Sequence, residues 1–281
     1  MSYYRIKSHA KVNLALNVIG KNSSLHKIES IVAFVSLCDE ILIKRIKSSK
    51  HNISFSGKFA RNINKKNSVS NLLNILEKKN FLQNIKFSIK IKKNIPPESG
   101  LGGGSMNAAS LLMFFVKKKI IKINQKQLVS ISKLVGSDVI LGLNPSYLIL
   151  NSSNKIKHFY NCKRIYTLIV KPNFGCSTRR IYSKVKKFSR AKFNRVSKKM
   201  LDFKYLKIAK NDLQPIAMSI YPKMKLIKRF LENLSTTVFV RMTGSGSALV
   251  AYFQTKENCD KAKRQFCKKY KNYWCIASKT I

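Results

Sequence analysis

One glycine-rich stretch and two oppositely charged residues have the types and spacing needed for chemistry on an anionic substrate. Residues 100–110 read GLGGGSMNAAS, and glycines permit backbone conformations and close approaches that other residues do not. A helix that begins after such glycines presents free N–H groups and a positive dipole end, which attract an anion such as a phosphate. Asp138 lies in the apolar stretch KLVGSDVILGL, where a buried carboxylate would need a charged partner. We expect Lys11 to be that partner.

The sequence around these residues predicts the elements that hold them. Apolar and polar side chains alternate over residues 85–91, before the glycines, and this period of two predicts a strand with one buried face. The apolar run over residues 108–116, closed by lysines at 117–119, predicts a buried helix with basic residues in its last turn. Residues 12–18 alternate like 85–91, so we expect a second half-buried strand, with Lys11 and Asn13 on its polar face.

The glycine stretch differs from the two commonest phosphate loops. No Gly-Lys-Ser/Thr triplet follows it, and its spacing is not G-x-G-x-x-G. A flexible linker is the alternative, but linkers are not usually set between a strong strand and a strong helix. We therefore predict a phosphate loop of a less common kind. For Asp138, local sequence leaves the role of a helix N-cap equally open.

Composition places the chain among globular proteins. With 281 residues, 44% of them apolar, it can bury one large core or two of ordinary size. Its apolar runs are too short to span a bilayer, and residues 1–11 lack the pattern of a secretory signal, so we expect a cytoplasmic protein. The six cysteines form no C-x-x-C pair, which favours reduced thiols. Cys259, Cys267 and Cys275 have no histidine nearby in the sequence and are predicted to be packing residues.

The charge is strongly basic, with 56 Lys and Arg against 11 Asp and Glu, a net +45. Such a chain gains affinity for nucleic acid through counterion release. However, the lysines are spread along the whole sequence, and Asn and Ile are abundant too, which favours a general compositional drift. Residues 184–199 are the best local candidate for phosphate or RNA contact, the alternative being a solvated helix and loop. We therefore expect nucleic-acid binding only through non-specific charge.

Several motifs resemble those of one enzyme family. Pro96 followed by GLGGGSMNAA resembles the ATP-binding loop of the GHMP kinases, which include galactose, homoserine, mevalonate and phosphomevalonate kinases. A-K-x-N-L at residues 10–14, G-S-D-V at 136–139 and R-M-T-G-S-G at 241–246 resemble further motifs of that superfamily. The resemblance implies an α+β GHMP kinase fold with two domains, residues 1–155 and 156–281. The first would be similar to a ribosomal-protein domain, and the second would be ferredoxin-like, as the strand and helix pattern after residue 238 also indicates.

Within that superfamily, Leu25-His26, T-x-x-I-Y at 178–182 and N-D-L at 211–213 are most similar to one branch. That branch phosphorylates the 2-hydroxyl of a cytidine diphosphate-linked methylerythritol in isoprenoid precursor biosynthesis. The resemblance implies ATP and Mg²⁺, with Asp138 taking the hydroxyl proton, Lys11 keeping it ionised, and Ser105 near the metal. The residues implied for ATP are Asn71, Leu72, Lys93, Pro96, Gly100, Leu101, Gly102, Gly103, Gly104, Ser105 and Asn107. Those implied for the substrate are Asn13, Leu25, His26, Thr178, Tyr182, Gly244 and Ser245.

The sequence departs from the family pattern at a few positions. Leu25 stands where the branch has an aromatic residue, Glu98 and Ser99 replace glycines before the loop, and Met106 replaces a serine. Asp39 and Glu40, at an acidic strand start, are expected to be structural. Two alternatives stay open: a GHMP kinase acting on homoserine or a mevalonate derivative, and a non-enzymatic RNA-binding protein on the same fold. We expect a monomer or homodimer that does not bind a membrane.

Overall fold

The structure, a computed structural model, describes residues 2–22, 25–61 and 63–281. The chain folds into two compact units that alternate along the sequence. Unit 1 comprises Met1–Lys11, Leu37–Pro97 and Gly102–Pro145, and unit 2 comprises Val12–Ser36, Glu98–Leu101 and Ser146–Ile281. The sequence prediction divides the chain once instead, between residues 155 and 156, and that boundary stays a prediction.

Two long paired strands, β1 (Tyr4–Lys21) and β2 (His26–Ile46), contribute residues to both units. The strand predicted over residues 12–18 lies within β1 and is therefore confirmed. The expectation that it is only half buried is wrong, because Lys11 and Asn13 on its polar face are only 4% and 3% exposed. An ion pair and hydrogen bonds, described below, satisfy these polar groups and permit their burial.

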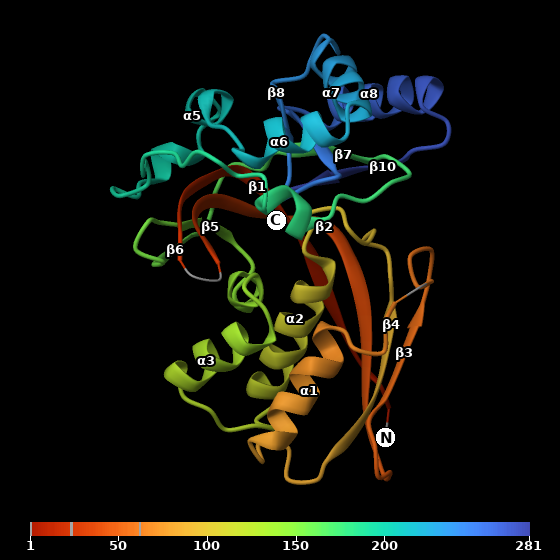
Figure 1. The fold of residues 1–281 in the computed structure, drawn as a ribbon. Helices are drawn as coiled ribbons and strands as arrows, with labels where there is room; N and C mark the ends of the chain where they lie inside the picture. Colours follow the sequence, from red (N-terminus) through yellow and green to blue (C-terminus); the bar gives the residue numbers. More distant parts are fainter. Residues whose placement is uncertain (1, 23–24, 62) are drawn as a thin grey trace. The chain divides into compact units, whose positions relative to one another are not determined.

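Unit 1 packs helices against a small sheet. The C-terminal part of β2 pairs antiparallel with β4 (Lys86–Lys92), which pairs in parallel with β3 (Asn52–Ser56). The helices α1 (Ser68–Lys78), α2 (Gly103–Lys117) and α3 (Gln125–Val135) are followed by the 3₁₀ helix η1 (Val139–Leu143). Figure 1 shows α1 and α2 side by side next to the sheet. One apolar core joins them, and it includes Ile43, Ile89, Leu72, Leu112 and Phe115.

Local signals explain where these helices begin. Reciprocal side-chain and backbone hydrogen bonds cap α1 through Asn67 and Ser70, and cap α3 through Asn124 and Gln127. The predicted strand before the glycines is confirmed as β4, and the predicted helix after them is confirmed as α2. However, α2 begins inside the glycine run, at Gly103, rather than at the apolar run. The loop glycines therefore form the first turn of the helix.

Unit 2 contains two sheet systems. The N-terminal part of β2 pairs antiparallel with β5 (Tyr147–Leu150), which pairs antiparallel with β6 (Ile156–Phe159). A separate antiparallel sheet has the order β10-β7-β9-β8, with bounds Trp274–Lys279, Tyr166–Lys171, Leu249–Phe253 and Phe239–Met242. This sheet matches the strand pattern predicted after residue 238.

The helices of unit 2 are α4 (Thr178–Tyr182), η2 (Lys198–Leu201), α5 (Phe203–Ile208), α6 (Leu213–Ile220), α7 (Lys223–Glu232) and α8 (Lys256–Lys269). Of these, α4, α6, α7 and α8 contribute residues to a second apolar core. Leu168, Leu249, Ile227 and Phe266 belong to this core, so sheet and helices share it. Within the described part of the chain, no helix is both long and apolar enough to cross a membrane.

Candidate active site

Lys11 and Asp138 form the ion pair predicted from the sequence. In unit 1, Lys11 Nζ lies 3.3 Å from Asp138 Oδ2. The sequence argument assumed that the carboxylate was the buried charge, and this is wrong. The Lys11 side chain is 4% exposed and that of Asp138 is 36% exposed. The buried ammonium therefore requires the carboxylate as its partner, and the carboxylate keeps access to solvent.

The alternative role for Asp138, a helix cap, is not realised. Asp138 precedes η1, but its side chain makes no capping hydrogen bond among the described residues. Its carboxylate is instead directed to Lys11. Opposite charges at this distance attract each other. The pair therefore presents a carboxylate suited to accept a proton.

The start of α2 lies beside this pair within unit 1. Gly102 precedes the helix with a φ of +72°, and a Cβ at this position would lie 3.1 Å from Cγ and Cε of Lys11. Only glycine combines this left-handed backbone with room for the lysine stem. Gly102 has no side chain with which to cap the helix, and uncapped N–H groups at a helix start can bind an anion. This agrees with the predicted phosphate loop.

A second buried Lys–Asp pair lies next to the same helix start. The ammonium of Lys93 contacts the carboxylate of Asp39, and a Cβ at Gly103 would lie 3.4 Å from Lys93 Nζ. Asp39 is fully buried and also accepts the N–H groups of Asn94 and Ile95, at 2.8 and 2.9 Å. It was expected to be structural, and its contacts agree, because it fixes a cation beside the loop.

Asp39 also holds one of the residues predicted for ATP. Asn107 Nδ2 donates to Asp39 Oδ2 at 3.0 Å. The other amide atom, Oδ1, is buried and has no hydrogen-bond partner among the described residues. An unsatisfied buried oxygen is costly and indicates a missing partner such as water, an ion or a ligand. Together with the Ser105 hydroxyl in the first helical turn, it is a hard oxygen donor of the kind that Mg²⁺ prefers.

The other residues predicted for ATP lie in different environments. Asn71 is exposed, whereas Leu72 is fully buried in the core of unit 1. Pro96 and Leu101 are buried, and Gly104 is exposed in the first turn of α2. A part for Leu72 in ATP binding stays a prediction, and its packing already explains why it is apolar.

Met106 and Glu98, two of the residues that depart from the family pattern, each have a side chain that lies close to a glycine. Met106 is buried, and a Cβ at Gly142 would lie 2.8 Å from its Sδ, so it fills space between α2 and η1. In unit 2, a Cβ at Gly175 would lie 2.0 Å from Glu98 Oε2. The Glu98 carboxylate therefore rests on the backbone at Gly175. Its own carbonyl accepts the Ser247 N–H at 3.1 Å.

In unit 2, the glycine turn after β8 packs closely on the residues before the loop. Gly100 has a φ of +74°, and a Cβ there would lie 2.0 Å from the carbonyl oxygen of Thr243. Asn13 Oδ1 accepts the Gly244 N–H at 2.9 Å, and Asn13 Nδ2 donates to Ser30 Oγ at 2.8 Å. Asn13, predicted to bind substrate, therefore holds the turn in place, and its contact with substrate stays a prediction.

Three aromatic rings gather in unit 2. The ring centroids of His26 and Tyr182 are 5.0 Å apart and those of His26 and Phe188 6.4 Å apart. Burial, and then the charge of Lys21, lower the pKa of His26, which favours its neutral form. Leu25 is 65% exposed.

Sequence reasoning did not single out Phe188. It lies in the basic stretch 184–199 with a second phenylalanine, Phe193, and no local pattern separates the two. In the structure Phe188 is 49% exposed and Phe193 is buried. Thr178 and Ser245, two further residues predicted to bind substrate, form a hydrogen bond between their hydroxyl groups, with the oxygens 2.8 Å apart.

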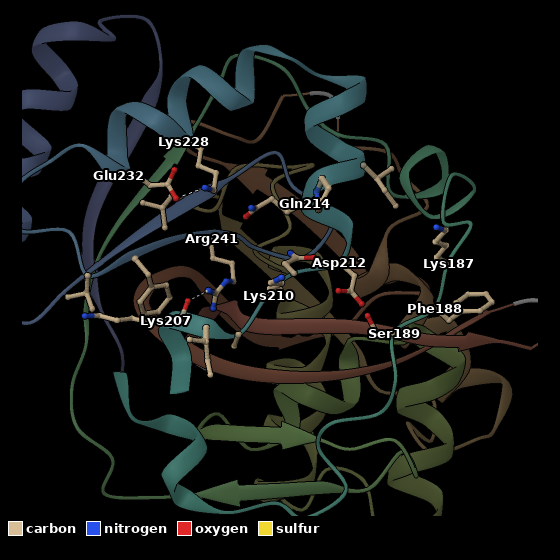
Figure 2. A pocket seen from close by; sticks show the side chains of 18 of the residues that line it. Lys187, Phe188, Ser189, Lys207, Lys210, Asp212, Gln214, Lys228, Glu232 and Arg241 are labelled. Carbon is tan, nitrogen blue, oxygen red and sulfur yellow. Dashed lines mark hydrogen bonds and ion pairs between the residues drawn. The ribbon is translucent and has the colours of Figure 1, made fainter. Parts of the chain in front are cut away.

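A basic hollow of about 1310 Å³ in unit 2 adjoins the aromatic cluster through Phe188, which is among its lining residues (Figure 2). Its lining includes Lys184, Lys186, Lys187, Lys207, Lys210 and Lys228. Lys228 pairs with Glu232, and the buried Arg241 donates to the Lys207 carbonyl at 3.5 Å (Figure 2). The hollow is therefore positively charged, but it is not lined by any residue predicted for catalysis, ATP or substrate.

Comparison with known sequences identifies similar proteins. The model of the GHMP kinases N terminal domain matches residues 67–146, and that of the GHMP kinases C terminal matches residues 186–272. A 4-diphosphocytidyl-2-C-methyl-D-erythritol kinase of Pelagibacter ubique is 52% identical over 281 residues, covering 100% of both chains. The kinase of the same name from Wolbachia sp. subsp. Drosophila simulans is 30% identical over 292 residues, again covering 100% of both.

Solved structures share the fold. The crystal structure of a 4-(cytidine 5'-diphospho)-2C-methyl-D-erythritol kinase matches with a TM-score of 0.79 at 20% identity, covering 99% of each chain. A homoserine kinase from Cytophaga hutchinsonii matches with a TM-score of 0.74 at 14% identity, covering 100% of this chain and 95% of that one. At these identities the likeness concerns the fold alone. The predicted two-domain α+β fold is confirmed.

Proposed function

The chain belongs to the GHMP kinase family, and from that premise we propose that it phosphorylates the 2-hydroxyl of 4-diphosphocytidyl-2-C-methyl-D-erythritol with ATP. The observation that carries the proposal is the 52% identity, over the full length of both chains, to a kinase named for that substrate. The product is an intermediate of isoprenoid, and hence terpenoid, precursor biosynthesis. The site residues of unit 1 have the chemistry that this reaction needs.

Proton removal falls to the Lys11–Asp138 pair. The Asp138 carboxylate accepts the proton of the substrate hydroxyl. The hydroxyl oxygen attacks the γ-phosphorus of ATP, and the bond between that phosphorus and the β,γ-bridging oxygen breaks, so that ADP leaves. Lys11 keeps Asp138 ionised and stabilises negative charge that develops on the attacking oxygen. The 3.3 Å separation of Nζ and Oδ2 supports both roles.

The start of α2 is the proposed site for the ATP phosphates. Its free N–H groups, and the Lys93 ammonium beside Gly103, offer donors and positive charge without a side chain in the way. Asp39 holds Lys93 in place. Mg²⁺ supplies neutralisation of phosphate charge when bound, and the oxygens proposed to hold it are Ser105 Oγ and Asn107 Oδ1.

Recognition of the cytosine is assigned to the aromatic cluster of unit 2. His26 and Tyr182 offer ring faces 5.0 Å apart between centroids, suited to a planar base. Leu25 provides no such face, and the exposed ring of Phe188 beside His26 supplies another. The expectations of a cytoplasmic location and of a monomer or homodimer belong to the same proposal.

Release of ADP by the purified protein tests the proposed function. The protein is supplied with Mg·ATP and the cytidyl alcohol, and in parallel with homoserine or mevalonate. We expect turnover with the cytidyl alcohol alone, and competitive inhibition by CDP. Turnover with homoserine or mevalonate instead would overturn the choice of acceptor. No turnover with any of the three, together with salt-sensitive RNA binding, would favour the non-enzymatic alternative.

A further inference from the structure

Two cysteines of unit 2 lie unexpectedly close together. Cys267 is in the last turns of α8 and Cys275 is in β10, and their Sγ atoms are 3.3 Å apart. Neither is part of a disulfide, and Cys267 is exposed whereas Cys275 is half-buried. The sequence prediction that Cys259, Cys267 and Cys275 are all packing residues is correct for Cys259, which is 1% exposed, and wrong for Cys267.

We propose that Cys267 and Cys275 are a redox modification site, which forms a reversible intramolecular disulfide. A disulfide bond is about 2.05 Å long, so the two sulfurs need to approach by roughly 1.2 Å from their separation of 3.3 Å. Rotation of an exposed cysteine side chain covers such a distance. The other cysteines differ: Cys162 Sγ contacts the Tyr160 carbonyl and Cys176 Sγ contacts Met224 Sδ.

The fold already brings the two ends of this link together. The connection between α8 and β10 is short, and the rings of Tyr270 and Tyr273 within it stack with centroids 5.5 Å apart. The β10 strand lies at the edge of the four-stranded sheet, where it pairs with β7. The disulfide would therefore join the end of α8 to an edge strand without moving either element far. A link that matches the native geometry constrains mainly the unfolded chain.

The oxidant we assign is a small-molecule disulfide such as oxidised glutathione. The thiolate of the exposed Cys267 attacks one glutathione sulfur and displaces the other glutathione as a thiol, which leaves a mixed disulfide on the protein. The Cys275 thiolate then attacks Cys267 Sγ, and the second glutathione leaves as a thiol. Overall, two protein thiols lose two electrons and two protons, and one small disulfide is reduced to two thiols.

Thiol counting on the full-length protein tests the proposal. The reduced protein is equilibrated without oxygen in glutathione buffers of increasing oxidised fraction, then alkylated and analysed by mass spectrometry. We expect the number of alkylated thiols to fall from six to four in one step, with the loss of two hydrogen atoms. Proteolysis should yield one linked pair of peptides, containing Cys267 and Cys275, and dithiothreitol should separate them.

Three serine variants serve as controls. Cys267→Ser and Cys275→Ser should each abolish the linked peptides and leave glutathione attached to the remaining thiol of the pair. Cys162→Ser, which removes a thiol outside the pair, should form the link as the wild type does. The proposal is overturned if the wild type keeps six alkylated thiols under oxidising conditions. It is equally overturned if both cysteines accumulate glutathione, or if the link joins two molecules.

Discussion

The buried ammonium of Lys11 lies 3.3 Å from the carboxylate of Asp138, which is accessible to solvent. This asymmetry suits a base that meets its substrate from the solvent side and is held in place by a buried cation on the protein side. Replacing the carboxylate with an amide keeps the shape and removes the proton acceptor. We therefore expect Asp138→Asn to lower kcat by roughly 10²–10⁴, the usual range for a lost general base.

The same ADP-release assay checks this prediction, with Asp260→Asn as the control. Asp260 is another aspartate beside a lysine, Lys256 at 2.9 Å, but the pair lies on the surface of α8. The control should turn over like the wild type. Near-wild-type kcat in Asp138→Asn would remove Asp138 from the mechanism.

Neighbouring carboxylates in β2 provide a second test, of stability. Asp39 is fully buried against Lys93, whereas Glu40 pairs with Arg5, whose side chain is 63% exposed. Removing one partner of a buried pair leaves an uncompensated charge, so Asp39→Ala should lower the free energy of unfolding by about 3–5 kcal/mol. Glu40→Ala should cost at most about 1 kcal/mol, because exposed pairs contribute little. Urea denaturation measures both, and equal losses would contradict the assignment.

Close contact at Gly100 gives a third prediction. A Cβ there would lie 2.0 Å from the Thr243 carbonyl oxygen, and the φ of +74° is itself unfavourable for alanine. Gly100→Ala should therefore displace the turn and the start of the loop, and raise KM for ATP. Gly20→Ala is the matched control, since its Cβ would meet nothing nearer than 3.9 Å. Unchanged KM and thermal stability in Gly100→Ala would show that the contact is not maintained in solution.

Acidification should destabilise the protein through its histidines. Burial lowers the pKa of His158 below the usual 6.5, and burial also lowers those of His26 and His51. Below about pH 6.5 the histidines of the unfolded chain bind protons that those of the folded chain do not. Their contribution to the free energy of unfolding is therefore fully present above that pH, and it is lost as the pH decreases toward the folded-state pKa.

Urea denaturation midpoints between about pH 7.5 and pH 5.5 test this pH dependence. His158→Asn alters the hydrogen bond between Nδ1 and Ser146 Oγ, which shifts stability at every pH. Loss of the titrating ring should, in addition, make the decrease of stability with falling pH shallower in this variant than in the wild type. An unchanged slope would mean that His158 does not contribute.

Leu25 offers a gain-of-function test of the base site. Leu25→Tyr adds an aromatic face at a position where leucine offers none, and aromatic contacts contribute about 0.5–1.5 kcal/mol. We expect KM for the cytidyl substrate to fall roughly two- to tenfold while kcat stays the same. Leu226→Tyr, at another exposed leucine in unit 2, should have no effect. If Leu25→Tyr also has none, the cytosine does not bind at this cluster.

Short-range patterns predicted the elements of this protein well. The alternation over residues 85–91 and the apolar run over 108–116 gave β4 and α2, because the period of apolar side chains reports which face of an element is buried. The glycine stretch likewise identified the helix start that lies beside two lysines. Helix bounds were less accurate, since glycines inside the first turn of α2 carry no helical signal of their own.

Partners far apart in the sequence could be assigned only in part. Lys11 was matched to Asp138 because so few aspartates lie in apolar surroundings. The contact of Asp39 with Lys93, and the exposure of Phe188 rather than Phe193, had no comparable signal. The proximity of Cys267 and Cys275 was also missed.

The sequence by itself determined the elements, the glycine-rich loop and the resemblance to the GHMP kinases, because each depends on residues adjacent or periodic along the chain. The tertiary structure alone decided which charge of the Lys11–Asp138 pair is buried, what holds Lys93, and which thiols meet. Burial and long-range pairing depend on how separate elements pack, and that packing is a property of the whole fold rather than of any local pattern.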